Sequence, residues 1–220
     1  MFVYIVESPS PKDFLVSRAE GHILFEALKL FGIDAHYCIA VDDKSLKQAL
    51  SVGLGELSTR LRKVPIIHLS AHGSDQGIEL TSHEFVTWKQ LASYLLSVSP
   101  PELRAGLLLC LCSCEGLSGI KMAMAEDPPP FFGVVGPTEA IDWYDGLVAF
   151  ITFYHLLFNK NKLPDEAAKQ MESSSGSCPF KAILASSAQR AYLERLQEYR
   201  LSHLSQSGTA SQTQPSSPPS

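Results

Sequence analysis

The sequence predicts an α/β protein: a three-layer α/β/α sandwich with a mostly parallel central sheet. Two observations indicate this fold class. Short apolar runs of strand length alternate with helical patterns along the chain, which is typical of βαβ units. The chain has 220 residues, of which 45% are hydrophobic and 19% charged, enough to bury one sizeable core. We therefore expect a single globular domain over residues 1–204.

The first half of the chain contains the signals for three strands and two helices. The continuous apolar runs predict strands at residues 2–7, 34–41 and 64–70. Helical patterns cover residues 18–31 and 43–61. The first of these has apolar residues near i, i+3, i+4, i+7 spacing, and Gly32 follows it, so we expect an amphipathic helix that ends there.

The second half of the chain continues the alternation. Weak alternation over residues 77–86 predicts a small hairpin. The expected strands are residues 107–112 and 131–135, and the expected helices are residues 87–98, 144–158, 165–172 and 180–204. Residues 205–220 consist mainly of Ser, Gln, Thr, Pro and Gly and cannot bury enough surface to fold. We expect them to be a disordered tail.

Charge and apolar content limit the classes of partner. A net charge of -5 argues against general binding to nucleic acid or to anionic membranes. The longest apolar run, residues 146–158, falls short of the ~20 residues that span a bilayer, and the N-terminus lacks a leader pattern. Five cysteines, an odd number, do not suggest a disulfide framework. We expect a cytoplasmic protein whose partners are proteins, peptides or small solutes.

Two of the buried runs end in reactive side chains beside glycine. The segment VPIIHLSAHG ends at His72 and Gly73, and the segment AGLLLCLCSCEG ends at Cys114, Glu115 and Gly116. Ligands and chemistry in open parallel sheets collect outside the carboxyl ends of the strands, and adjacent strands lie only ~4.8 Å apart. We therefore expect the two side chains to meet as a nucleophile and its base.

The chemistry follows from the properties of a thiol. A free cysteine titrates near 8.5, so it needs a nearby imidazole to take its proton or to stabilise the thiolate at neutral pH. His72 is placed to do this for Cys114, whereas His68 lies deeper in the same strand and is expected to be structural. The N–H groups of Gly73 and Cys114 are candidates for an oxyanion hole.

The motifs SAHGSDQGIEL and LCLCSCEG resemble the His-Gly block and the Cys-x-Gly block of caspase-like (clan CD) cysteine peptidases. The order of the two blocks along the chain, and the hairpin and helix expected between them, are also similar to those of that group. The region from Gly133 to Ala168 is similar to the bacterial CHAT branch of the same group, so the resemblance covers roughly residues 1–190. It implies a peptidase with a Cys/His dyad and no cofactor, and a regulated defence or cell-death role with a regulatory protein partner.

Several positions depart from the caspase pattern. Cys112 and Ser113 stand where caspases have a substrate-binding glutamine and an alanine, so strict aspartate specificity is not supported. Arg18 resembles in position the caspase arginine that lines the substrate pocket, although a solvated residue at a helix start would look the same. Asp142 and Asp145 could form a pocket for basic side chains, or could serve as turn and N-cap residues.

Three alternatives remain beside the peptidase. A zinc site built from His68, His72, Cys112 and Cys114 is disfavoured, because residues i and i+4 of a strand are ~13 Å apart, and we expect no metal. The chain could instead be a catalytically inactive caspase-like module that binds proteins. It could also be a thiol amidase that acts on small molecules.

Overall fold

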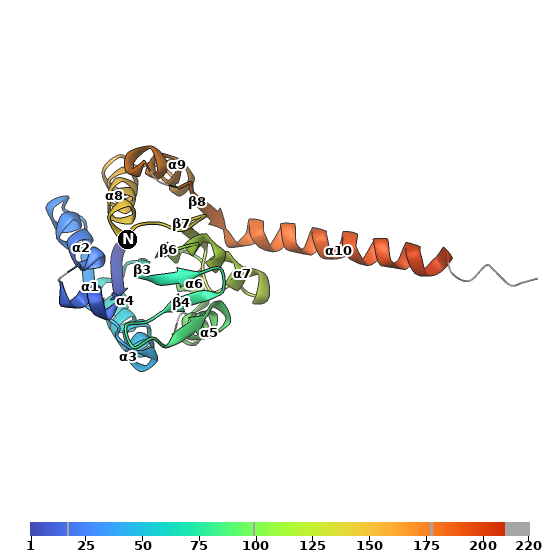
Figure 1. Ribbon diagram of the computed structural model, residues 1–220, viewed down its shortest axis with the longest axis horizontal. Coiled ribbons are helices and arrows are strands. Elements are labelled where there is room, and N and C mark those ends of the chain that lie inside the picture. The colour runs from blue at the N-terminus through green and yellow to red at the C-terminus, as the bar shows by residue number, and fades with distance from the viewer. Residues whose placement is uncertain (17, 99, 177, 210–220) are drawn as a thin grey trace, which may run out of the picture.

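The computed structural model describes residues 1–16, 18–98, 100–176 and 178–209. Its central sheet has the strand order β2-β1-β3-β6-β7-β8 (Figure 1). These strands are β1 (Phe2–Ser8), β2 (Ala35–Ile39), β3 (Pro65–Ser74), β6 (Leu108–Cys112), β7 (Gly133–Pro137) and β8 (Phe180–Leu184). All neighbours pair in parallel except β7 and β8. The predicted α/β/α sandwich with a mostly parallel central sheet is confirmed.

Helices cover both faces of the sheet. One layer consists of α2 (Glu20–Leu30), α8 (Trp143–Tyr154) and α9 (Pro164–Ser175). The other consists of α3 (Asp43–Gln48), the π-helix η1 (Ala49–Gly53), α4 (Leu54–Leu61), α5 (Trp88–Val98), α7 (Lys121–Ala125) and the start of α10 (Ala185–Thr209). The short helices are α1 (Pro11–Leu15), α6 (Pro101–Arg104), η2 (Gly116–Ile120) and η3 (His155–Asn159). In Figure 1, α10 extends away from the rest of the molecule.

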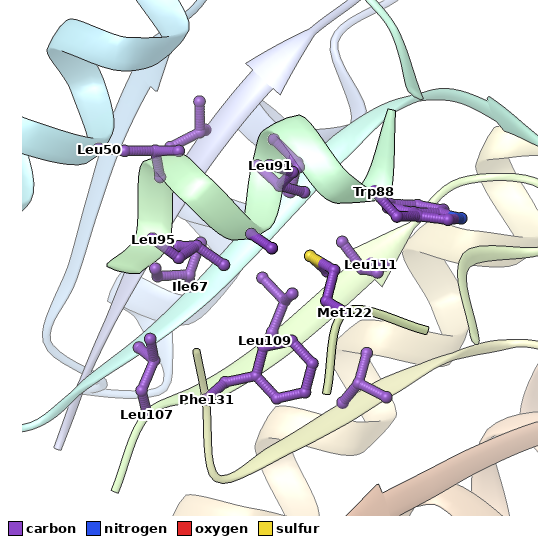
Figure 2. Close-up of a cluster of buried hydrophobic side chains, with 14 of the residues drawn as sticks. Leu50, Ile67, Trp88, Leu91, Leu95, Leu107, Leu109, Leu111, Met122 and Phe131 are labelled. Carbon is purple, nitrogen blue, oxygen red and sulfur yellow. The ribbon is translucent and has the colours of Figure 1, made fainter. Parts of the chain in front are cut away.

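The alternation of side chains along each strand divides the core into two layers. Figure 2 shows the layer beneath α5, where Leu91 and Leu95 pack against Ile67 of β3 and Leu109 of β6. The other layer includes Cys110 and the α8 aromatics. Each fully buried leucine contributes about 1.5–3 kcal/mol, so these two layers fix the sheet on which the site is built.

Two expected elements differ in type from those observed. The expected helix over residues 180–204 begins with a strand, because β8 pairs antiparallel with β7, with Ile183 opposite Val134. The chain between β1 and α2, where no helix was expected, contains α1. Since both short segments carry weak local signals, their conformations depend on tertiary pairing and on a capping residue.

Other boundaries shift while the type of element is confirmed. The hairpin forms as β4 (Gly77–Glu79) and β5 (Phe85–Thr87), and β3 continues to Ser74 because its end pairs antiparallel with β4. The helix expected over 43–61 is interrupted by the π turn at η1. Of the tail expected over 205–220, residues 205–209 belong to α10 and residues 210–220 lie outside the described residues. Within the described ranges, the helices are too short or too polar to span a bilayer.

Candidate active site

His72 and Cys114 lie where two adjacent parallel strands end. β3 and β6 pair in register up to Ser70 opposite Cys112, and each candidate residue follows two positions later in its chain. A β-carbon at position 73 would lie 2.8 Å from Ser113 Cβ and 3.0 Å from the carbonyl oxygen of Cys114. The two strand ends therefore touch directly, and only glycine at position 73 allows this approach.

A tight turn holds Cys114 at the edge of the sheet. Glu115 has a φ of 54°, in the left-handed region, and its N–H donates to the Glu139 carbonyl at 2.9 Å. The N–H of Gly116 donates to the Ser113 carbonyl at 3.0 Å, and a β-carbon there would lie 2.6 Å from the Leu111 carbonyl oxygen. These constraints reverse the chain immediately after Cys114 and explain the glycine two residues later.

The three cysteines of this strand differ in burial. Cys110 and Cys112 are buried, whereas Cys114 is half-buried, with its Sγ 3.7 Å from the Ile141 carbonyl oxygen. Burial raises the pKa of Cys110 to about 12. Burial, followed by the negative charge of Glu20, raises the pKa of Cys112 well above its ordinary value. Because the thiolate is the nucleophile, the raised pKa values of Cys110 and Cys112 argue against them, and Cys114 is the accessible thiol of the three.

His72 is exposed at the rim, and Asp13 is its charged neighbour. The Nε2 atom of His72 lies 3.9 Å from Asp13 Oδ2, and the side chain of His72 is 59% exposed. Asp13 is itself fixed, because the Ser10 hydroxyl donates to it at 2.5 Å. In the part of the chain that the structure describes, no hydrogen bond joins His72 to Cys114. Catalytic hydrogen bonds are often long until substrate binds.

Asp13 was not among the residues predicted from the sequence. It lies at the third position of α1, where its N–H donates to the Ser10 hydroxyl at 3.1 Å. The Ser-x-x-Asp spacing that produces this cap directly follows the first strand. This spacing could have predicted the start of a short helix there, with Asp13 in its first turn.

A pocket of about 220 Å³ connects these groups. Its lining comes from the ends of β1, β3 and β6, from α1 and its flanks, and from the start of α8: Glu7, Ser8, Pro9, Ser10, Asp13, Arg18, Glu20, Ser70, Ala71, His72, Cys112, Ser113, Cys114, Ile141, Asp142 and Trp143. Six residues singled out from the sequence thus share one pocket. The other two do not line it: Gly73 packs behind the rim against Ser113, and Asp145 lies in the first turn of α8.

The two charged candidates at the rim have different partners. Arg18 lies 3.9 Å from Asp13 Oδ1, so part of its charge is already balanced. Asp142 occupies the N-cap position of α8, but its side chain makes no capping hydrogen bond and instead accepts from the Tyr144 hydroxyl at 3.3 Å. Because Asp142 does not cap α8 and has no cationic partner in the described residues, its carboxylate can bind a ligand in the pocket that it lines.

The floor of the pocket contains a buried polar cluster of Glu20, His68 and Cys112. The potential ligand atoms of these side chains all lie within 4.8 Å of one another. His68 Nε2 lies 3.6 Å from Glu20 Oε2, and His68 Nδ1 lies 3.1 Å from the Tyr154 hydroxyl. His68 and Cys112 also belong to the zinc site that the sequence analysis disfavoured, but the third member of the observed cluster is Glu20. No sequence signal marked Glu20, since an acidic residue in a first helical turn is commonplace.

Glu7 lies beside this cluster and differs from Glu20 in its hydrogen bonds. The Glu7 carboxylate accepts from the N–H groups of Gly21 at 2.9 Å and His22 at 3.2 Å and from the Tyr37 hydroxyl at 2.8 Å. Burial nevertheless raises its pKa above the usual value. Glu7 is therefore a satisfied structural carboxylate that fixes the start of α2 against β1.

The sequence matches no family model and no curated protein. Among solved structures, the chain is similar to the Arg-specific cysteine proteinase gingipain R, with a TM-score of 0.49 and 11% sequence identity. The similar region covers 81% of this chain and 45% of the gingipain chain. This chain thus spans less than half the length of that protein.

Proposed function

We propose that the chain is a cysteine endopeptidase in which Cys114 is the nucleophile and His72 the general base and acid. The observation that carries this proposal is the register of β3 and β6, which places both residues at the rim of one pocket. Cys114 is the accessible thiol there, and the imidazole of His72 is an exposed side chain of the same pocket.

In the proposed mechanism, His72 takes the proton of the Cys114 thiol, the sulfur attacks the scissile carbonyl carbon, and the carbonyl electron pair moves onto oxygen. The N–H group of Cys114 stabilises this oxyanion, whereas Gly73, the second donor expected from the sequence, does not line the pocket. His72 then gives a proton to the leaving amine, and the carbon–nitrogen bond breaks to leave a thioester. His72 next takes a proton from water, which attacks the thioester and releases the acid and the thiol. Asp13 holds the imidazole ring and stabilises its cationic form.

The charges of the pocket favour a basic substrate side chain. Four carboxyl groups line it, at Glu7, Asp13, Glu20 and Asp142, against the single guanidinium of Arg18. Arg18 is paired with Asp13, whereas Asp142 at the rim is available. We therefore propose that the pocket accepts the side chain of a Lys or Arg residue that precedes the cleaved bond.

The resemblance to the CHAT branch supports a biological setting for this activity. We propose that the domain over residues 1–204 acts in regulated proteolysis, such as a defence or cell-death response, in the cytoplasm, with a protein partner that controls the site. Protein or peptide substrates are the expected ligands, without nucleic acid, membrane or organic cofactor.

A peptide library with basic and acidic residues before the scissile bond tests the activity and its specificity together. The wild-type chain is expected to cleave after Lys or Arg, and Cys114→Ala is expected to abolish cleavage without loss of folding. Cys38→Ala is the matched control, because Cys38 is also a half-buried free thiol but lies in β2, away from the pocket. Cleavage that survives in Cys114→Ala would reject Cys114 as the nucleophile, and a folded wild type with no activity would favour the inactive binding module.

A further inference from the structure

Three side chains that commonly bind metals meet at the floor of the pocket, each from a different element. Glu20 begins α2, His68 lies within β3 and Cys112 ends β6. They are 3%, 0% and 6% exposed, respectively. Among the described residues, no other group of three or more His, Cys, Asp or Glu side chains brings its ligand atoms so close together.

Three polar atoms of this cluster lack hydrogen-bond partners among the described residues. Both carboxylate oxygens of Glu20 and the Nε2 atom of His68 are buried without a hydrogen bond from any described residue. The distance between Glu20 Oε2 and His68 Nε2 is 3.6 Å, longer than a hydrogen bond. A buried carboxylate without donors is strongly unfavourable, and a cation among these atoms would compensate it. Glu7 shows the contrast, because its carboxylate accepts three hydrogen bonds nearby.

We propose that Glu20, His68 and Cys112 bind a divalent cation, for which Zn²⁺ is the best match. Carboxylate oxygen, imidazole nitrogen and thiolate sulfur are the three ligand types that zinc uses. In a tetrahedral site with bonds of ~2.0–2.3 Å, ligand atoms lie roughly 3.3–3.7 Å apart. The 3.6 Å separation of Glu20 and His68 already fits, and all separations are within 4.8 Å. The site therefore closes by side-chain movements of about 1 Å.

The surroundings of the cluster fit a three-ligand site with an open position. Glu20 and Cys112 line the pocket, so a water molecule can complete the coordination from that side. Tyr154 is fully buried and its hydroxyl lies 3.1 Å from His68 Nδ1. This contact holds the other ring nitrogen, Nε2, toward Glu20, which is the arrangement that orients histidine ligands in metal sites.

The metal site stands independently of peptide hydrolysis, but it has a consequence for the proposed enzyme. A cation at the floor would occupy the end of the pocket and neutralise Glu20, and so would exclude a basic substrate side chain. The metal-bound form would then be the inhibited one. This regulatory consequence rests on the proposed function.

Cobalt(II) reports the site directly, because thiolate ligation gives a sulfur-to-metal charge-transfer band and tetrahedral coordination gives intense visible bands. We expect the reduced, metal-free full chain to bind one Co²⁺ with both signatures, and Zn²⁺ to displace it. Tyr154→Phe keeps the ring and removes the hydroxyl, and should weaken binding about 10–100-fold. Glu20→Gln and Cys112→Ala should weaken it by at least about 100-fold, with loss of the charge-transfer band in Cys112→Ala.

Two control variants separate this site from other thiols. Cys114→Ala removes the rim thiol, and Cys38→Ala removes a thiol of β2 that does not line the pocket, so both should keep the charge-transfer band. Circular dichroism and thermal melting check that each variant is folded. The proposal is overturned if the wild type gives no charge-transfer band, if the band persists in Cys112→Ala, or if either control loses it. Because Tyr154→Phe conserves volume, unchanged Co²⁺ affinity in this folded variant also counts against the site.

The two proposals fail in different ways. Binding is measured on the Cys114→Ala variant, which cannot hydrolyse peptides by the proposed mechanism. A Co²⁺ complex of that variant, together with an inactive wild type, would leave the metal site standing and reject the peptidase. If the wild type cleaves peptides, Zn²⁺ does not inhibit it and no Co²⁺ complex forms, the peptidase would stand and the metal site would be rejected.

Discussion

Replacing Gly73 with alanine tests whether the contact between the two strand ends positions the dyad. The added β-carbon would lie 2.8 Å from Ser113 Cβ, 2.9 Å from Ser113 Oγ and 3.0 Å from the Cys114 carbonyl oxygen. Ordinary van der Waals contact begins near 3.4 Å. The carbonyl belongs to the backbone and cannot rotate away, so the end of β3 must shift from β6 by roughly half an ångström.

This shift is expected to lower both the stability of the fold and the rate of the reaction. Overpacking of this kind costs about 1–3 kcal/mol of unfolding free energy, which urea denaturation measures. Because a misplacement of ~1 Å can cost about 100-fold in rate, we expect kcat/KM for a peptide substrate to fall roughly 10- to 100-fold. The rate loss should exceed the loss of folded protein, since the shift separates His72 from Cys114.

Gly55→Ala is the matched control. A β-carbon there meets nothing within 4 Å, and Gly55 lies in α4 with an ordinary helical backbone. This substitution should leave activity unchanged and add about 0.4–1 kcal/mol of stability. If Gly73→Ala is as stable and as active as the wild type, the strand ends do not position the dyad in the way described here.

Three further predictions concern the core, a surface ion pair and the orientation of the imidazole. Phe150→Ala should lower the unfolding free energy by about 3–5 kcal/mol in urea denaturation, because the ring is fully buried beneath the site; a loss below ~1 kcal/mol would refute this. The hydrogen bond from Lys63 lowers the pKa of Asp34 below 3.8, so this carboxylate stabilises the fold above that pH and the effect is lost as the pH falls. The difference in unfolding free energy between the wild type and Asp34→Asn should therefore shrink in acid, and a pH-independent difference would contradict the assignment. Asp13→Asn should lower kcat roughly 10-fold, less than the 10²–10⁴-fold expected for His72→Ala, and an unchanged kcat would show that Asp13 does not orient the imidazole.

The parallel core of the fold could be predicted because each strand carries its own signal. The apolar runs that became β1, β3 and β6 are long enough to identify alone, and their carboxyl ends share one edge of the sheet. That reasoning predicted the placement of His72 and Cys114, which both line the pocket at this edge. Their catalytic roles remain predictions.

The features that could not be predicted from the sequence depend on contacts between segments that are far apart in the chain. The sequence FKAIL of β8 suits a helix or a strand equally well, and its pairing with β7 decides the outcome. Glu20 has an ordinary helix-start signal, and its burial follows only when α2 packs over β1 and β2. The contact of Cys112 with Gly146, where a β-carbon would lie 2.7 Å from the sulfur, likewise joins segments far apart in the chain.

The adduct of a peptide electrophile with a basic residue at its reactive end tests the central claim most directly. The wild-type chain is incubated with this probe, and mass spectrometry locates the modified sulfur. We expect one modification, at Cys114, formed much more slowly in a folded His72→Ala variant because the thiol then lacks its base. Modification of a different cysteine, or a rate that does not depend on His72, would contradict the assignment of these two residues as nucleophile and base.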